Sequence, residues 1–301
     1  MDAKTRMSQA TYSSYESIIR IHIKPALGDM SLIDLQPNII RKFLDKKVID
    51  GKSKRTVEYI HVILKAALTL AVNDGLLYRH PMAGVKKPHV QKSKMVVLTL
   101  TQLRWLLATI DDSEYFRLIY VAANTGLRRE EILALRIQDI NTRKHTLSVE
   151  QTLHYNNQET YITPTTKNQS SHRTISLNDI TFSYIKKQIV CVQKEKLATL
   201  NYQDNDLLFP TQNGLPLFPA YVSRKLKKYV KLLKLPDDFT FHGLRHTHAT
   251  LLLESGVNFK LIQTRLGHSS FKVTMDTYSH VTPDMEQSLI EKILDLSVSV
   301  K

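Results

Sequence analysis

The stretch His242-Gly-Leu-Arg-His-Thr-His248 concentrates imidazole and guanidinium groups at the start of a helix predicted over residues 243–254. His242 and Arg245 are three residues apart, so both side chains project from one face of that helix. His242 and His246 also have a metal-ligand spacing, but the glutamate of a His-Glu-x-x-His zinc site is missing and no cysteine lies nearby. We therefore keep His242 and Arg245 as candidate site residues and interpret His246 and His248 as packed polar residues.

A second stretch, Thr125-Gly-Leu-Arg-Arg-Glu-Glu131, joins a turn to the start of another predicted helix. Gly126 permits a tight bend, after which Arg128 stands beside outward-pointing backbone N–H groups, a natural seat for a phosphate. Glu131 lies three residues on, on the same helix face, where its carboxylate can orient the guanidinium of Arg128. On its own, this stretch is more typical of an ordinary surface Arg–Glu pair.

The third stretch is Leu266-Gly-His-Ser-Ser270, followed ten residues after His268 by Tyr278. A lone tyrosine at helical spacing usually belongs to a core or an interface. Here it accompanies two arginines at helix starts and two histidines that follow turns. The sequence has no G-x-x-x-x-G-K-[ST] nucleotide loop and no carboxylate cluster typical of a two-metal nuclease.

Charge and composition limit the class of partner. The 301 residues carry a formal net charge of +14, spread over both halves of the chain. This favours a polyanion, either nucleic acid or an acidic membrane surface, and two basic domains suggest a clamp on a phosphate backbone. A well-solvated basic surface is the alternative. No stretch approaches the roughly 18 uncharged apolar residues of a membrane span, which disfavours the membrane.

The remaining composition indicates a reducing compartment. Cys191 is the only cysteine, so no intramolecular disulfide can form, in keeping with the cytoplasm. The N-terminal residues are polar and lack the apolar core of a signal peptide.

The first part of the chain is predicted to be helical, with helices over residues 11–23, 37–51 and 53–73. Pro25 is expected to end the first of them. We predict a helical DNA-binding domain over residues 1–85, with Lys52, Lys54 and Arg55 on its basic face. Prolines, glycine and lysines then interrupt the periodicity over residues 79–98, and we place a basic linker at 86–98. A linker with Lys86 and Lys87 could run along a DNA duplex and contact its phosphates, although an ordinary solvated connector fits the sequence equally well.

The second part is predicted to mix helices with a few strands. Thr99 to Gln102 fits a helix capping box, and alternating residues over 146–149, 160–163 and 173–177 predict a small antiparallel sheet with turns near Asn156 and Lys167. The predicted fold is therefore mainly α with a small antiparallel β-sheet: a helical N-terminal domain, a mixed α+β domain over residues 99–282 and a tail helix over 283–301. Helices are expected over residues 113–124, 130–135, 179–197, 220–233, 243–254, 258–266, 270–278 and 283–296.

Taken in order, the three stretches resemble the active-site motifs of the tyrosine recombinase (phage integrase) family, strongly over about residues 99–283 and more loosely before them. The family pattern is Arg, Lys, His-x-x-Arg, His or Trp, and Tyr. The resemblance assigns Arg128 with supporting Glu131, the hairpin lysine Lys167, the His242 and Arg245 box, His268 and the nucleophile Tyr278. Lys144 and Lys186 are alternatives for the hairpin lysine.

The resemblance implies DNA cleavage through a 3′-phosphotyrosyl linkage to Tyr278, with no metal or nucleotide cofactor. Two arginines, Arg128 and Arg245, would stabilise the charge on the nonbridging phosphate oxygens. His242 would accept the phenol proton, Lys167 would protonate the leaving 5′-oxygen, and His268 would bind the scissile phosphate. The covalent bond would conserve the energy needed for rejoining.

The family also implies the partners: double-stranded DNA with attachment or core sites, a homotetramer on two duplexes, and accessory DNA-bending or directionality factors in the bacterial cytoplasm or nucleoid. The apolar stripe of the tail over residues 283–301 would dock on a neighbouring protomer, or alternatively on its own domain. Many integrases carry a further N-terminal domain for arm-type sites, whereas this sequence opens in the helical domain, which leaves a dependence on such sites open.

Three alternatives remain beside integration and excision of a mobile element. A chromosome or plasmid dimer resolvase would use the same chemistry for a different task. A type IB topoisomerase would share the chemistry without pairing two duplexes. A DNA-binding regulator that kept the fold would lack catalysis, and the intact set of arginine, lysine, histidine and tyrosine argues against it.

Overall fold

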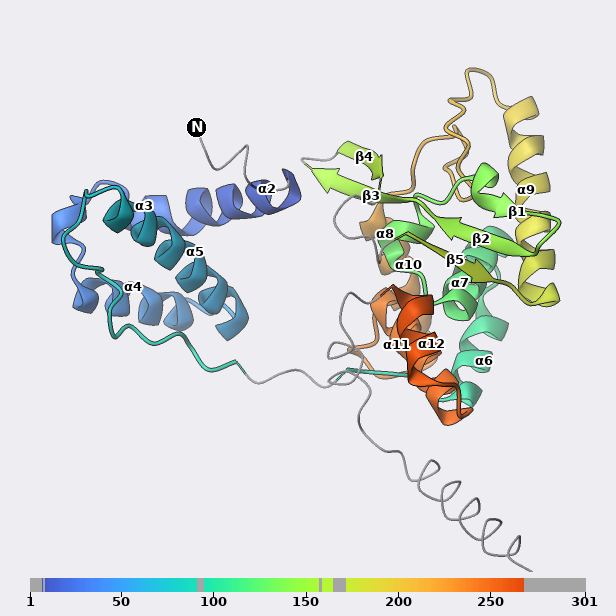
Figure 1. Cartoon of the computed structure of the whole chain (residues 1–301). Coiled ribbons are helices and arrows are strands. Elements are labelled where there is room, and N and C mark those ends of the chain that lie inside the picture. Colours follow the sequence, from blue (N-terminus) through green and yellow to red (C-terminus); the bar gives the residue numbers. More distant parts are fainter. Residues whose placement is uncertain (1–6, 8, 91–94, 157–158, 165–171, 268–301) are drawn as a thin grey trace, which may run out of the picture. The chain divides into compact units, whose positions relative to one another are not determined.

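The computed structural model describes residues 7, 9–90, 95–156, 159–164 and 172–267. The chain divides into two compact units, Met1–Lys94 and Met95–Lys301, each with its own core (Figure 1). The predicted fold class is confirmed, since both units are built mainly from helices and the strands of the second are antiparallel.

In the described part of the N-terminal unit, the first helical run is longer than predicted. Helix α2 (Gln9–Ile18) continues through a π-helical turn (Ile19–Ile23) into α3 (Lys24–Leu27). The prediction that Pro25 ends the run was wrong. Pro25 lies in the first turn of α3, where its missing N–H costs little, and the preceding π turn interrupts the α-helical bonding pattern.

Two longer helices follow in the described part of this unit. Helix α4 (Pro37–Ile49) follows a short 3₁₀ turn, and α5 (Lys54–Asn73) begins at Ser53, whose Oγ accepts a 3.1 Å hydrogen bond from the backbone N–H of Thr56. The predicted cap is therefore confirmed. The apolar faces of these helices form one core, in which Ile40, Val57 and Ile60 are fully buried.

The core of this unit also includes part of the stretch whose periodicity is interrupted. Met82 and Val85 are buried in it, and His61 Nε2 lies 3.0 Å from the carbonyl oxygen of Val85. Residues 82–85 therefore belong to the packed unit and are not a free connector.

Helix α5 differs from expectation in one respect. By length and composition alone, it is long and apolar enough to cross a membrane. Its apolar side chains instead supply much of the core of the N-terminal unit, as those of a central helix in a globular domain do.

In the second unit, α6 (Leu100–Thr109) begins with the predicted capping box, in which Thr99 and Gln102 exchange hydrogen bonds of 3.0 and 3.2 Å. Helix α7 (Ser113–Thr125) and the four-residue α8 (Arg129–Ile132) follow, the latter shorter than predicted. The backbone N–H of Leu98 donates to Thr247 Oγ1 over 3.0 Å, which fixes the entry of the chain against α11 (Phe241–Glu254).

The strands form two antiparallel groups. Strands β1 (Ile140–Asn141), β2 (Thr146–Val149) and β5 (Arg173–Ser176) make a sheet in the order β1-β2-β5. Strands β3 (Gln151–Asn156) and β4 (Glu159–Pro164) pair separately as a hairpin whose last pair joins Asn156 to Glu159. The turn predicted around Lys167 lies outside the described residues.

In the described residues after the sheet come helices α9 (Asp179–Ala198), α10 (Pro219–Leu232), α11 and α12 (Phe259–Leu266). Helix α7 packs against α9 and α11, and α12 packs against α11 and β5. The end of α7, the start of α8, strand β5, and helices α11 and α12 therefore meet in one region. The helices predicted over residues 270–278 and 283–296 lie outside the described residues.

Candidate active site

Gly126 ends α7 and turns the chain towards Arg128. Its φ of +67° is a left-handed conformation that glycine adopts without strain. An added Cβ would approach carbon atoms of the His248 and Leu266 side chains to 2.7 Å each, so there is also no room for one. This turn sets Arg128 at the N-cap of α8.

Arg128 and Glu131 make the contact predicted from their spacing. Arg128 Nη1 donates to Glu131 Oε1 over 2.6 Å, and the backbone N–H of Arg128 donates to Glu131 Oε2 over 2.8 Å. The side chain of Arg128 is 34% exposed, whereas that of Glu131 is only 3% exposed. Glu131 thus holds a guanidinium that remains accessible to solvent.

A second arginine, which the sequence analysis did not single out, binds the same carboxylate. Arg173 Nη2 donates to Glu131 Oε2 over 2.7 Å, and Nη1 donates to Oε1 over 3.2 Å. Burial alone would raise the pKa of Glu131, but hydrogen bonding and charge from Arg173, followed by the charge of Arg128, lower that pKa to about 2. Glu131 is therefore a carboxylate throughout the physiological pH range.

Arg245 lies on α11 and is 1% exposed. Its Nη1 donates to the carbonyl of Gly126 over 2.9 Å and its Nη2 to the carbonyl of Leu266 over 2.6 Å. The buried charge thus lies against carbonyl oxygens, which compensate part of its desolvation.

The last turn of α12 accepts hydrogen bonds from three arginines. The carbonyl of residue 265 accepts from Arg173 Nε over 2.8 Å, that of 266 from Arg245 over 2.6 Å, and that of 267 from Arg128 Nη2 over 3.1 Å. Carbonyl groups at a helix C-terminus lack helical partners and carry partial negative charge. One helix end therefore aligns guanidinium groups that come from β5, α11 and the start of α8.

The charges of two of these arginines act on His242. Burial, then the positive charges of Arg245 and Arg128, lower the pKa of His242 below its ordinary value. Its imidazole is therefore neutral at pH 7 and able to accept a proton. The arrangement brings Arg128, Glu131, His242 and Arg245 into one region.

The neighbouring histidines are also neutral. Burial, followed by the charges of His242 and Arg245, lowers the pKa of His246 to about 4. Burial and the charge of Arg265 lower the pKa of His248 to about 3, and His248 Nε2 accepts a 3.1 Å hydrogen bond from Arg265 Nε. The interpretation of His248 as a packed polar residue is confirmed.

The His242 and His246 rings lie 4.5 Å apart and nearly perpendicular. Among the described parts of the chain, no group of three or more histidine, cysteine, aspartate or glutamate side chains is placed to hold a metal ion.

Three predicted site residues, Lys167, His268 and Tyr278, lie outside the described residues. The two alternatives to Lys167 are both described. Lys144 lies in the β1–β2 turn, where its backbone N–H binds Asn141, and Lys186 on α9 lies over the ring of Phe182 at 5.1 Å.

The predicted DNA-contacting residues of the N-terminal unit are exposed, and two of them share an acidic partner. Glu58 accepts from Arg55 over 2.8 Å and from Lys87 over 2.9 Å. Lys54 and Lys86 line a cavity of about 290 Å³, and Lys52 is exposed after α4.

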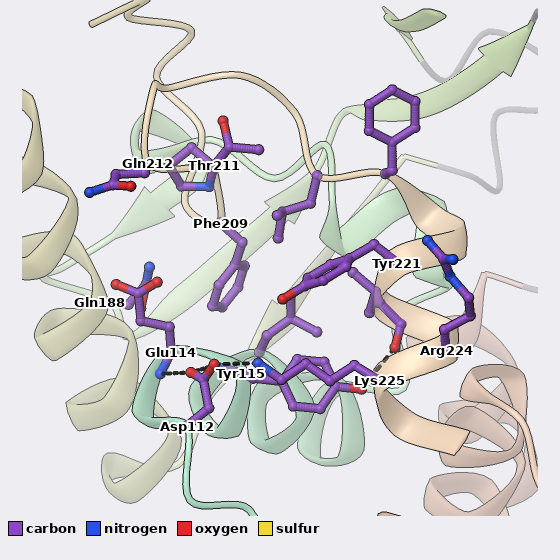
Figure 2. A pocket seen from close by; sticks show the side chains of 15 residues that line it. Asp112, Glu114, Tyr115, Gln188, Phe209, Thr211, Gln212, Tyr221, Arg224 and Lys225 are labelled. Atoms are coloured by element: carbon purple, nitrogen blue, oxygen red, sulfur yellow. Dashed lines mark hydrogen bonds and ion pairs between the residues drawn. The ribbon is translucent and has the colours of Figure 1, made fainter. Parts of the chain in front are cut away.

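A larger cavity of about 540 Å³ lies elsewhere in the second unit, beside α7 and α10 (Figure 2). Lys225 reaches across it to the carboxylate of Asp112 and lies 4.8 Å from the ring centre of Tyr115 and 5.9 Å from that of Tyr221. None of the predicted site residues that the structure describes lines this cavity.

Residues 97–285 match the family described as the phage integrase family, and residues 1–48 match the phage integrase N-terminal SAM-like domain. The chain belongs to the phage integrase family. It is a tyrosine recombinase, an enzyme of DNA recombination and integration that cleaves and rejoins DNA strands.

Relatives of this recombinase include both integrases and XerC-like proteins. A tyrosine recombinase XerC-like protein of Caldanaerobacter subterraneus subsp. tengcongensis is 27% identical over 97% of this chain and 80% of that protein. The ICEBs1 integrase of Bacillus subtilis is 28% identical over 95% of this chain and 77% of that protein. The transposase from transposon Tn916 of Enterococcus faecalis is 24% identical over 96% of this chain and 74% of that protein.

Solved structures share the fold of this recombinase. The Tn1549 transposon integrase in complex with transposon right end DNA has a TM-score of 0.80 at 24% identity, covering 97% of this chain and 96% of that chain. A lambda integrase dimer bound to a COC′ core site has a TM-score of 0.68 at 21% identity, and the match covers 92% of this chain and 73% of that chain.

Proposed function

We propose that Arg128, Lys167, His242, Arg245, His268 and Tyr278 form the active site of this recombinase, with Glu131 as a supporting residue. The observation that carries the proposal is the alignment of Arg128 and Arg245 by the last turn of α12, with His242 within the field of both. These groups come from separate parts of the sequence, and the carbonyl-bonded arginines keep their charge at any working pH.

The two arginines contribute in different ways. Arg128 is 34% exposed and presents donors to a nonbridging phosphate oxygen directly. Arg245 is fixed by the carbonyls of Gly126 and Leu266 and supplies preorganised positive charge beside the same phosphate. Fixed positive charge in a site that excludes water stabilises the pentavalent transition state without reorganisation.

Cleavage transfers the scissile phosphate from the 5′-oxygen of the DNA to Tyr278. The phenolic oxygen of Tyr278 attacks phosphorus, His242 accepts the phenol proton, and the bond from phosphorus to the 5′-oxygen breaks. Lys167 supplies a proton to the leaving 5′-oxygen, and His268 hydrogen-bonds the scissile phosphate. The lowered pKa of His242 supports its assignment as the base, because a neutral imidazole is required to accept the proton.

The substrate is double-stranded DNA. We assign the physiological role to integration and excision of a mobile element, supported by relatives named as an ICEBs1 integrase and a Tn916 transposase. We further propose that the enzyme acts as a homotetramer on two duplexes, joined by the tail over residues 283–301. Residues Lys52, Lys54, Arg55, Lys86 and Lys87 would contact the DNA backbone, and accessory factors would set direction, in the cytoplasm or nucleoid.

A suicide DNA substrate, nicked next to a core site selected from random duplexes by binding, tests the proposal. The wild-type enzyme should form a covalent protein–DNA product, and Tyr278→Phe should form none while binding the same DNA. Transfer of the cleaved strand to a second duplex then distinguishes a recombinase from a topoisomerase, which would only rejoin the original strand. A covalent product that persists in Tyr278→Phe would refute the assignment of the nucleophile.

A further inference from the structure

We propose that Arg173 is a positioning residue for DNA cleavage, which holds Glu131 so that Glu131 holds Arg128 with its charge directed at the phosphate. This inference rests on the proposed role of Arg128 as a phosphate ligand. Neither the sequence motifs nor the family resemblance assigned a role to Arg173.

The contacts of Glu131 carry the inference. Each carboxylate oxygen accepts two hydrogen bonds, one from each arginine: Oε1 from the side chains of Arg128 and Arg173, and Oε2 from the backbone N–H of Arg128 and from Arg173. Arg173 and Glu131 are 4% and 3% exposed, so this pair is buried, whereas Arg128 extends towards solvent. Arg173 thus occupies the acceptor directions of Glu131 that the backbone and side chain of Arg128 leave open.

Charge balance explains why a second arginine is needed. Arg128 and Glu131 alone form a neutral pair, in which the carboxylate cancels the field of the guanidinium at a nearby phosphate. With Arg173 the trio carries a net charge of +1, because one carboxylate charge is shared between two guanidinium groups. The carboxylate therefore no longer cancels the whole charge of Arg128. A buried carboxylate that loses one of two ion-pair partners also becomes costly to keep charged. Loss of Arg173 would therefore weaken both the orientation and the field of Arg128.

A purely structural role is the alternative. Arg173 Nε also donates to the carbonyl of residue 265 over 2.8 Å, which links β5 to α12 and contributes to packing. The two roles differ in what they predict for Glu131: a structural arginine leaves the chemistry of the folded enzyme unchanged, whereas a positioning arginine sets the protonation and orientation of the carboxylate.

The test compares Arg173→Met and Arg173→Lys with the wild-type enzyme in single-turnover cleavage of the suicide substrate at saturating DNA. We expect Arg173→Met to reduce the cleavage rate roughly 10- to 100-fold, as loss of a supporting partner does at other sites, with DNA affinity nearly unchanged. Arg173→Lys, which restores the charge without the two-pronged geometry, should recover part of the rate.

A double-mutant cycle with Glu131→Gln separates the two roles. If Arg173 acts through Glu131, the double variant should cleave no more slowly than Glu131→Gln alone. The matched control is Arg117→Met. Arg117 is also a buried arginine of this unit, but it binds Gln188 over 2.6 Å and Cys191 over 3.4 Å. The Arg117→Met substitution should lower the thermal midpoint without changing the cleavage rate of the folded protein.

Either of two results would overturn the inference: a wild-type rate in folded Arg173→Met, or additive losses in the cycle. Should Arg173→Met fail to fold, the same criteria apply to Arg173→Lys. Absence of covalent product from the wild-type enzyme would instead refute the proposed function, so the two failures are distinguishable.

Discussion

Arg245 Nη2 donates a 2.6 Å hydrogen bond to the carbonyl of Leu266, the last residue of α12. This bond joins α11 to the helix end that directly precedes His268 in the sequence. Arg245 Nη1 also donates to the carbonyl of Gly126, which follows the last residue of α7. One buried side chain therefore fixes two turns, and each of these turns leads into a proposed catalytic residue.

Arg245→Lys should abolish most of the cleavage while leaving DNA binding nearly intact. A single ammonium group cannot span both carbonyls, so its charge would no longer be held at the same point beside the phosphate. Loss of a preorganised group that stabilises an oxyanion typically costs about 10²- to 10³-fold in rate, and we expect a loss of that size. Single-turnover cleavage and equilibrium binding of the same DNA would be measured together, with Arg245→Ala as the more severe variant. Equal losses in binding and cleavage would argue against a transition-state role.

Gly126→Ala should destabilise the second unit and reduce cleavage. The left-handed backbone costs a non-glycine residue about 1–2 kcal/mol, and the new methyl group would also lie 2.7 Å from atoms of His248 and Leu266. The thermal midpoint measures the loss of stability, and the cleavage rate of the folded protein measures the loss of activity. Gly75→Ala is the control, because Gly75 also has a positive φ, of +74°, but nothing lies within 4 Å of an added Cβ. If both variants lose the same stability, steric crowding at Gly126 is irrelevant.

The pH dependence of cleavage should reflect His242. A base must be unprotonated, and the pKa of His242 is lowered from its ordinary value of 6.5 by burial and by the charges of Arg245 and Arg128. The value of kcat/KM should therefore decline as the pH falls, with a midpoint below pH 6.5. His242→Gln should be slow and lack this decline, whereas His246→Gln should keep it although the two rings lie only 4.5 Å apart. If the decline disappears in His246→Gln, then His246 is the base and the assignment of His242 is wrong.

The features that the sequence predicted depend on residues close together along the chain. The caps at Ser53 and Thr99 and the pairing of Arg128 with Glu131 involve spacings of three residues, which local geometry fixes. Pro25 was misjudged because a π turn before it removed the conflict that normally ends a helix. These are questions of local backbone geometry, and most of the helices and strands could be placed on that basis.

The contacts that assemble the site are not local. Arg173 reaches Glu131 across 42 residues, and Arg128 reaches the carbonyl of Gly267 across 139, so no spacing rule reveals them. One signal was available for Arg173. It occupies an inward position of β5, two residues before the buried Ile175, and a charged residue at such a position requires a buried partner. The identity of that partner depends on how the strand packs against α8.

Thermal stability should fall as the solution is acidified below pH 6.5, and His248 should account for part of the loss. In the unfolded chain a histidine binds a proton near pH 6.5, whereas burial and Arg265 hold the pKa of His248 at about 3 in the folded enzyme. Between these values the unfolded state binds more protons, so stability rises with pH across the window. The penalty should reach about 2 kcal/mol at pH 5 relative to pH 8. Glu131 does not contribute to the change between pH 8 and pH 5. Its pKa falls from 4.5 in the unfolded chain to about 2 in the folded enzyme, so the stability that it provides is lost only below about pH 4.5.

His248→Gln provides the measurement, since a glutamine oxygen can accept the hydrogen bond from Arg265 without titrating. The thermal midpoint of the variant should fall less than that of the wild-type enzyme between pH 8 and pH 5. Glu195 acts in the opposite direction, because burial, followed by the hydrogen bond and charge of Glu114, raises its pKa to about 7 and favours the folded state on acidification. That contribution is common to both proteins and cancels in the difference between them. Parallel curves for the two proteins would show that His248 is protonated equally in the folded and unfolded states, contrary to its burial beside Arg265.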